Sequence, residues 1–251
     1  MNDSNNTLNN FNQYLNAAEQ GDAEAQNFLG KCYSIDDGVD KDYKLGAYWF
    51  AKSAEQGNAY GQNGLGVCYY NGQGVVKDNE MAVYWLSLSA NQGFAKAQYN
   101  LGNCYYKGEG IVKDCEKAAF WYAKAAEQGH ARGQYNLGNC YYNGQGVAQD
   151  YQKAAYWFAK SAEQGYDKAQ CNIGVCYEHG QGVPQDYDKA IYWYTKSAEQ
   201  ENDVAQYNLG VCYKNGYGVP KDHDKAIYWY TRSAKQCNAM AMKVIMRQNK
   251  H

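Results

Sequence analysis

The sequence is poor in proline, in histidine and in long apolar stretches. It contains only 2 Pro and 4 His among 251 residues. Because proline breaks helix interiors, its scarcity leaves nearly the whole chain open to helix formation. A membrane-spanning helix needs about 20 consecutive apolar residues, and the sequence has no such run. We therefore expect no membrane insertion.

The amino-terminal stretch and the charge balance exclude further classes. The segment MNDSNNTLNNFNQYLNAAEQ lacks the basic and apolar parts of a secretory signal peptide. We therefore expect a cytoplasmic protein, with a trimmed leader or another export route as the alternative. The 24 basic and 26 acidic residues are well mixed and give a formal net charge of −2. Since no broad positive field is present to attract phosphates, we expect no nucleic-acid partner.

Residues suited to chemistry do not recur together. The histidines occupy non-equivalent places, and no two cysteines form the C-x₂-C pair of a metal site. The Gly-x-Gly segments follow no predicted strand and are predicted turns rather than phosphate-binding loops. No Ser, His and Asp fall into a nucleophile arrangement. We expect no catalytic residue, no metal, no cofactor and no enzymatic activity.

Tryptophan recurs with a fixed period that covers most of the chain. Every Trp lies 36 residues after the preceding one, at Trp49, Trp85, Trp121, Trp157, Trp193 and Trp229. A cysteine ladder has the same period, at Cys32, Cys68, Cys104, Cys140, Cys176 and Cys212. A period of this length indicates tandem structural repeats.

One repeat, residues 94–129, divides into two amphipathic segments around a glycine-containing loop. The spacing predicts that the first segment buries Ala97, Leu101, Cys104 and Tyr105, and that the second buries Ala118, Trp121, Tyr122 and Ala125. Asp114 is a predicted N-cap of the second helix, and Gly129 is predicted to close it. Both segments are therefore predicted helices.

The predicted fold is an all-α, right-handed α-solenoid of antiparallel helix pairs in 36-residue repeats. A single repeat domain over 1–251 is expected to contain repeats at 22–57, 58–93, 94–129, 130–165, 166–201 and 202–237. Residues 1–21 are predicted to form an N-terminal tail and capping helix, and residues 238–251 a C-terminal capping helix. Capped ends favour a monomer.

The unit is similar to the Sel-one-like (SLR) repeat, a relative of the tetratricopeptide repeat. The matching segments in repeat 94–129 are Leu101-Gly102, Gly108-Glu109-Gly110, Asp114, Trp121-Tyr122 and 125–129. The resemblance implies an adaptor that binds a partner protein or peptide. Cysteine-rich relatives proposed to bind or hydrolyse β-lactams leave an enzyme as an alternative, but they carry two cysteines per repeat.

Some positions depart from the repeat pattern. Asp36-Asp37-Gly38 lacks the first loop glycine, Glu201 and Cys237 replace the closing glycine, and Gly46 replaces an alanine. We expect these departures to loosen the outer repeats locally. Cys115, Cys171 and Cys237 lie outside the ladder and are expected to be accessible, whereas the ladder is expected to be buried and free of disulfides. Accessible thiols throughout would instead favour thiol or metal buffering.

The exposed side of the first helices supplies the candidate binding site. In related helical repeats this side is concave, and asparagine amides there can both donate to and accept from a peptide backbone. Tyrosines beside them would be rigid anchors. The candidate partner-binding residues are Asn100, Asn103, Tyr106, Lys107, Tyr135, Asn136, Asn139, Tyr142, Asn143, Asn172, Tyr207 and Asn208. The alternative is a solvated polar groove.

A second row of rings precedes the tryptophans. Its members are Tyr48, Tyr84, Phe120, Tyr156, Tyr192 and Tyr228. Helical spacing places them on the outer side of the second helices. They are interpreted either as rings that lie over neighbouring helices and seal the array, or as a second binding stripe.

Overall fold

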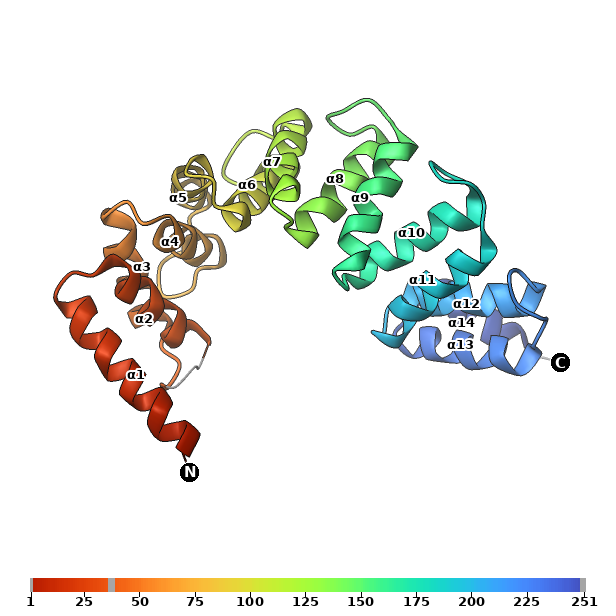
Figure 1. Ribbon diagram of the computed structural model, residues 1–251, viewed down its shortest axis with the longest axis horizontal. Helices are drawn as coiled ribbons and strands as arrows, with labels where there is room; N and C mark the ends of the chain where they lie inside the picture. Colours follow the sequence, from red (N-terminus) through yellow and green to blue (C-terminus); the bar gives the residue numbers. More distant parts are fainter. Residues whose placement is uncertain (1, 36–38, 249–251) are drawn as a thin grey trace. The chain divides into compact units, whose positions relative to one another are not determined.

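The computed structural model describes residues 2–35 and 39–248, and over these ranges the chain consists of helices without strands (Figure 1). It forms two compact units, Met1–Gln128 and Gly129–His251. The first unit contains α1 (Asn2–Glu19), α2 (Ala23–Ile35), α3 (Tyr43–Glu55), α4 (Ala59–Asn71), α5 (Asn79–Asn91), α6 (Ala95–Lys107) and α7 (Cys115–Glu127). The second unit contains α8 (Ala131–Asn143), α9 (Tyr151–Glu163), α10 (Asp167–His179), α11 (Tyr187–Glu199), α12 (Asp203–Asn215), α13 (His223–Lys235) and α14 (Ala239–Gln248). The predicted all-α architecture of repeated helix pairs is confirmed.

The predicted helix ends are confirmed as well. The aspartates before the second helices accept hydrogen bonds from backbone amides in the first turn, at Asp42, Asp78, Asp114, Asp150, Asp186 and Asp222. The closing glycines at 57, 93, 129 and 165 have φ values between 81° and 89°. These left-handed conformations cost glycine little, which explains the residue type at these ends.

Two glycines of repeat 94–129 allow close approach between neighbouring segments. A Cβ on Gly102 would lie 2.7 Å from the ring of Tyr122, so only glycine lets α6 pack closely on α7. A Cβ on Gly110 would lie 2.0 Å from the carbonyl oxygen of Asn79. The loop after α6 therefore rests on the first residue of α5, in the preceding repeat.

The core consists of clusters that join the second helix of one repeat to the first helix of the next. Leu86 of α5, for example, packs with Leu101 and Cys104 of α6. Trp121 was predicted to be buried with Tyr122, and this is wrong for the tryptophan. Tyr122 is 2% exposed, whereas Trp121 is half-buried at the edge of this cluster. Consecutive helix positions point about 100° apart, so only one of the two can face the centre of the core.

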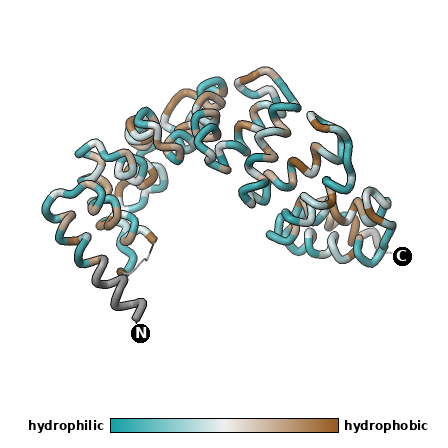
Figure 2. The backbone as a smooth tube through the Cα atoms, viewed as in Figure 1, coloured by the Kyte–Doolittle hydropathy of each residue, from teal (hydrophilic) through white to brown (hydrophobic). Residues whose placement is uncertain are grey.

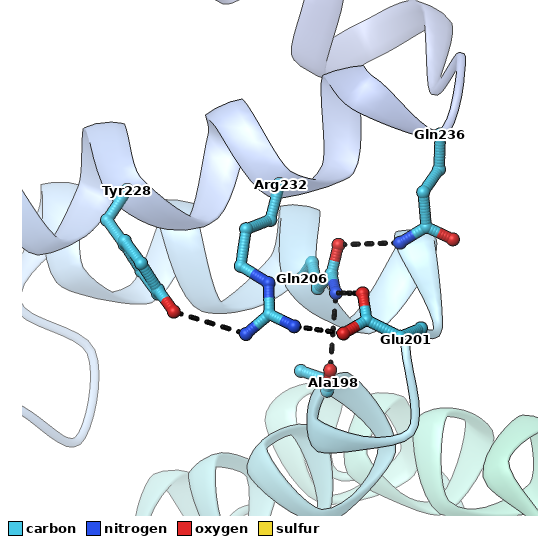
Figure 3. A network of polar contacts seen from close by, with 6 residues as sticks. All are labelled: Ala198, Glu201, Gln206, Tyr228, Arg232 and Gln236. Carbon is cyan, nitrogen blue, oxygen red and sulfur yellow. Dashed lines mark hydrogen bonds and ion pairs between the residues drawn. The ribbon is translucent and has the colours of Figure 1, made fainter.

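Glu201 and Cys237, which replace the closing glycine, keep the backbone conformation of the other helix ends. Both residues take the left-handed conformation of the glycines, with φ values of 63° and 66°. The amide of Asn202 still donates to the carbonyl of Ser197 at 3.2 Å, like the corresponding bond after Gly93. The carboxylate of Glu201 is held by Arg232 and by Gln206 (Figure 3).

The other departures lie in the first repeat. Gly46 makes room for Ser34, whose Oγ would lie only 2.7 Å from a Cβ at this position and donates to the carbonyl of Gly30. The expected loosening at Gly46 is therefore replaced by a specific contact. Asp36-Asp37-Gly38 lies outside the described residues.

All nine cysteines are free, and the ladder is buried as predicted. Cys115 is half-buried and Cys237 is exposed, but the expectation for Cys171 is wrong, because it is buried among Ala190, Tyr194 and Leu209. Cys171 takes the place of a tyrosine that faces the same neighbouring helices in other repeats. Burial raises the pKa of Cys171 to about 12.

Polar and apolar residues alternate along the helices, so that no coloured helix in Figure 2 is continuously hydrophobic. Within the part of the chain that the structure describes, no helix has the length and apolar character needed to cross a membrane.

Candidate interaction surface

The first helices of the second unit, α8 and α10, enclose a small pocket. Its volume is about 200 Å³, and we name it the α8–α10 pocket. The lining residues are Asn139, Tyr142, Asn143, Phe158, Asn172 and Val175. Four of these residues are among the predicted binding residues, so the structure brings them together from two consecutive repeats.

Asparagine side chains in this pocket are partly paired with one another. Asn172 Nδ2 donates to Asn139 Oδ1 at 3.3 Å, and Asn143 Nδ2 donates to the carbonyl of Asn139 at 3.0 Å. An asparagine side chain offers two N–H donors and two acceptor lone pairs. One bond per side chain therefore leaves capacity for hydrogen bonds to a bound segment.

Tyr142 lines the α8–α10 pocket, and contacts within the protein fix its side chain. Its hydroxyl donates to Gln181 Oε1 at 2.8 Å, in the loop of the next repeat. Its ring meets Tyr151 edge to face with centroids 5.2 Å apart. Burial raises the pKa of Tyr142. The residue is thus held in place before any partner binds.

The other predicted residues of the second unit do not line this pocket. Tyr135 packs edge to face on Tyr166, with centroids 5.2 Å apart, and belongs to the core. Tyr207 packs against Tyr230 at 5.6 Å. Asn136 of α8 and Asn208 of α12 are half-buried.

In the first unit, predicted residues of α6 have partners in their own and the preceding repeat. Asn100 Nδ2 donates to Asn63 Oδ1 at 3.0 Å, and Asn103 accepts a hydrogen bond of 2.8 Å from Tyr122. Tyr106 is 38% exposed, and Lys113 Nζ lies 5.8 Å from the centroid of its ring.

Lys107 belongs to a charged network between α4 and the loop after α6. Its ammonium group lies 2.9 Å from the hydroxyl of Tyr70 and 3.5 Å from the carboxylate of Glu109. The hydrogen bond that Tyr70 donates lowers the pKa of Glu109. The hydrogen bond between Lys107 and the hydroxyl of Tyr70 raises the pKa of Lys107. This network joins neighbouring repeats.

A larger pocket in the first unit was missed by the sequence analysis. Its volume is about 480 Å³, and we name it the α2–α4–α6 pocket. The lining residues are Lys31, Ser34, Ile35, Phe50, Tyr60, Asn63, Gly64, Val67, Cys68, Gln73, Phe94 and Lys96. The signal that could have revealed it was the departure of Tyr60, Gly64 and Phe94 from the residues at the equivalent positions of most other repeats.

The outer row of rings on the second helices is half-exposed, with exposed fractions of 50–54%. Each ring meets the tryptophan that follows it edge to face, with centroids 5.0–5.1 Å apart. Lys160 lies over Tyr156, for example, with Nζ 6.0 Å from the ring centroid. These contacts lie within one helix, and they do not place the rings over neighbouring helices.

Residues suited to metal binding do not cluster. Among the side chains that the structure describes, no three of His, Cys, Asp or Glu are grouped so that they could hold a metal ion.

Comparisons with known proteins agree with this architecture. A crystal structure of a protective antigen from uropathogenic Escherichia coli, which displays an SLR fold, is 38% identical with a TM-score of 0.83. The match covers 91% of this chain and 49% of the antigen, so this chain spans about half of that protein.

Two further structures are similar. A Sel1 repeat protein from Oxalobacter formigenes is 33% identical with a TM-score of 0.79, over 94% of this chain and 68% of that one. A putative Sel1 repeat protein from Klebsiella pneumoniae shares the fold at 22% identity and a TM-score of 0.52, over 80% of this chain and 98% of that one. A search of curated proteins finds no match.

The family comparison starts each repeat one residue later than the sequence period did, and it ends the last one at residue 236. The Sel1 repeat is matched at residues 23–58, 59–94, 95–130, 131–166, 167–202 and 203–236. The chain therefore belongs to the Sel1 repeat family, whose members generally mediate protein–protein interactions.

Proposed function

We propose that this protein is a scaffold that binds a partner protein or peptide on the face of its first helices. The observation that carries the proposal is the α8–α10 pocket, where Asn139, Tyr142, Asn143 and Asn172 meet. A pocket of about 200 Å³ is large enough for one side chain of a partner and is smaller than the usual site for a small-molecule substrate.

The chemistry of this pocket suits an extended peptide. Phe158 and Val175 provide apolar walls, and the asparagine side chains provide donors and acceptors for a peptide backbone. Because Tyr142 is already fixed by Gln181, binding costs little side-chain entropy at this residue.

Non-catalytic binding also fits the state of the thiols. Seven of the nine cysteines are buried, which leaves Cys115 and Cys237 as the accessible ones. The sequence alternative of thiol buffering needs most thiols to be accessible. A β-lactam hydrolase would need a nucleophile, and no residue of the α8–α10 pocket is paired with a general base.

The test is affinity capture from a lysate of the source cell with the intact chain and a double variant, Asn139→Ala with Asn172→Ala. Removing both members of the pair leaves neither amide without its partner, so the variant should fold. We expect the parent to retain a partner that the double variant loses.

Tyr192→Ala is the matched control, because Tyr192 lies on a second helix of the same unit and is 53% exposed. It should retain the partner. Loss of the partner with Tyr192→Ala but not with the double variant would move the binding surface to the outer row of rings. Capture of no partner by the parent would contradict the scaffold proposal.

A further inference from the structure

The α2–α4–α6 pocket is built from positions at which this repeat array breaks its own pattern. Tyr60 stands where four other repeats have a charged residue (Glu24, Lys96, Arg132 and Lys168) and one has Val204, and its ring is 51% exposed. Ile35 stands where later repeats have Lys107 or other polar residues, and it is 68% exposed. Together with Phe94 they line one pocket, and exposed apolar side chains that are contiguous are typical of a binding surface. The residues of this pocket that depart from the repeat pattern are Ile35, Tyr60, Gly64 and Phe94.

Phe94 lines this pocket and stands at the N-cap of α6, where it provides no side-chain hydrogen bond to cap the helix. Asn58 and Asn202, at the equivalent position, accept hydrogen bonds from the first-turn amides of their helices, whereas Phe94 makes no side-chain cap bond. Replacing an asparagine cap by an apolar residue costs about 1 kcal/mol. The ring instead lies against Tyr60, with centroids 4.6 Å apart, and both rings line the pocket. Tyr166, at the equivalent position of the second unit, also makes no cap bond, but of these two rings Phe94 is the one that lines this pocket.

Gly64 leaves a buried acceptor without its expected partner. In the next repeat, Asn100 donates to Asn63. One repeat earlier, the equivalent positions are Gly64 and Asn27, so no side chain is present to donate. Accordingly, Oδ1 of Asn27 is buried without a hydrogen-bond partner. Burying an acceptor without a donor costs free energy, and Gly64, which lines the pocket, is the position that lacks the donor.

The positive charge of the α2–α4–α6 pocket favours an acidic partner. Among the described residues, its lining contains Lys31 and Lys96, both exposed, and no carboxylate. Lys31 Nζ lies 5.5 Å from the ring centroid of Tyr60, and neither lysine forms an ion pair with any described residue. An apolar floor under two unpaired ammonium groups complements an apolar side chain flanked by carboxylates.

We propose that the α2–α4–α6 pocket binds an acidic peptide segment of a partner protein, one large apolar side chain of which packs against Tyr60 and Phe94 while neighbouring carboxylates pair with Lys31 and Lys96. This inference rests on the proposed scaffold function and specifies the chemistry of the partner. It concerns a different pocket, in the other unit, from the one that carries the proposed function.

The test is fluorescence anisotropy of the full chain with labelled synthetic peptides. The probe is Gly-Glu-Asp-Phe-Asp-Glu-Gly, compared with Gly-Gln-Asn-Phe-Asn-Gln-Gly and with Gly-Glu-Asp-Ala-Asp-Glu-Gly. We expect the neutral peptide and the alanine peptide each to bind at least about tenfold more weakly than the probe. Binding of the probe should also weaken as salt is raised, because the ion pairs are exposed.

Variants distinguish loss of the pocket from loss of the fold. Phe94→Asn restores the cap seen at Asn58 and removes one ring, so the helices should persist while the affinity for the probe falls at least about tenfold. The matched control is Tyr166→Asn, since Tyr166 is also an uncapped N-terminal ring but lies in the second unit. Lys96→Glu should weaken binding of the probe and strengthen binding of a peptide with lysines in place of the acidic residues. Lys168→Glu, at the equivalent position two repeats later, should change neither affinity.

The inference is overturned if the probe does not bind, if the neutral peptide binds as well as the probe, or if Phe94→Asn and Tyr166→Asn behave alike. Such a result with partner capture intact would leave the proposed function standing, with recognition elsewhere. Probe binding that follows these variants supports the pocket even if the α8–α10 variants retain their partner.

Discussion

The side-chain amide of Gln128 donates a hydrogen bond to Gln98 Oε1 at 2.8 Å, which joins the end of α7 to the start of α6. Gln98 in turn donates to the carbonyl of Ala90 at 3.2 Å, in the preceding repeat. The same glutamine pair recurs in all six repeats at 2.7–2.9 Å. A buried polar side chain thus connects helices within a repeat and between repeats.

This pair leads to a prediction for Gln98. Gln98→Ala should lower the free energy of unfolding by about 1–3 kcal/mol, because Gln98 is 4% exposed and the carbonyl of Ala90 loses its donor. Gln128→Ala should cost less, since Gln128 lies at the surface. Urea unfolding followed by circular dichroism measures both. A larger effect for Gln128→Ala would show that the bond to Ala90 is unimportant.

The two aromatic residues of α7 should differ in their contribution to stability. Tyr122→Ala should cost about 3–5 kcal/mol, the usual range for removing a buried aromatic side chain. Trp121→Ala should cost about 2 kcal/mol, because the indole is only half-buried and less apolar surface is removed from water. Thermal and urea unfolding of both variants provide the comparison. A larger loss of stability for Trp121→Ala than for Tyr122→Ala would show that Trp121 lies at the centre of the core.

Thiol reactivity should follow burial. In the native state we expect Cys237 to react with Ellman's reagent at once and Cys115 more slowly, while all nine cysteines react in denaturant. Burial raises the pKa of Cys68 and Cys104 to about 11, so little thiolate forms at neutral pH. Rapid reaction of Cys171 in the native state would contradict its placement in the core.

The N-cap aspartates should make the free energy of unfolding depend on pH in the acidic range. Hydrogen bonds from the amides of Lys117, Lys153, Lys189 and Lys225 lower the pKa of Asp114, Asp150, Asp186 and Asp222 below the ordinary value of 3.8. This stabilisation is fully present above the unfolded pKa and is lost as the pH falls through the lower folded pKa.

The corresponding measurement is Tm as a function of pH. We expect Tm to fall below about pH 4 in the parent. The fall should be smaller in a variant with asparagine at all four positions, because asparagine caps a helix without titrating. Parallel curves for the two proteins would assign the acid sensitivity to other carboxylates.

The sequence predicted the helix pairs, their caps and their closing turns because each depends on local residue types repeated every 36 positions. It did not distinguish Trp121 from Tyr122, since both are large aromatic residues and the amphipathic pattern alone does not show which of two consecutive positions faces the centre of the core. The burial of Cys171 depends on α11 and α12, which its own helix pattern does not reveal.

The candidate site was predicted only in part. Helical spacing correctly placed Asn139, Asn143 and Asn172 on one surface, but hydrogen bonds between their side chains depend on the distance between α8 and α10. The α2–α4–α6 pocket results from residues that break the repeat pattern. The features that all repeats share therefore do not indicate this pocket, whereas the differences between repeats do, at Tyr60 and Phe94.

The most direct test of the scaffold account is hydrogen–deuterium exchange of the chain with and without its captured partner. Bound segments should open less often, so we expect added protection in 131–143 and 167–179, which form α8 and α10. Segments 151–163 and 187–199, the adjoining second helices, should change little. Protection confined to those second helices, or no change anywhere, would contradict binding on the face of the first helices.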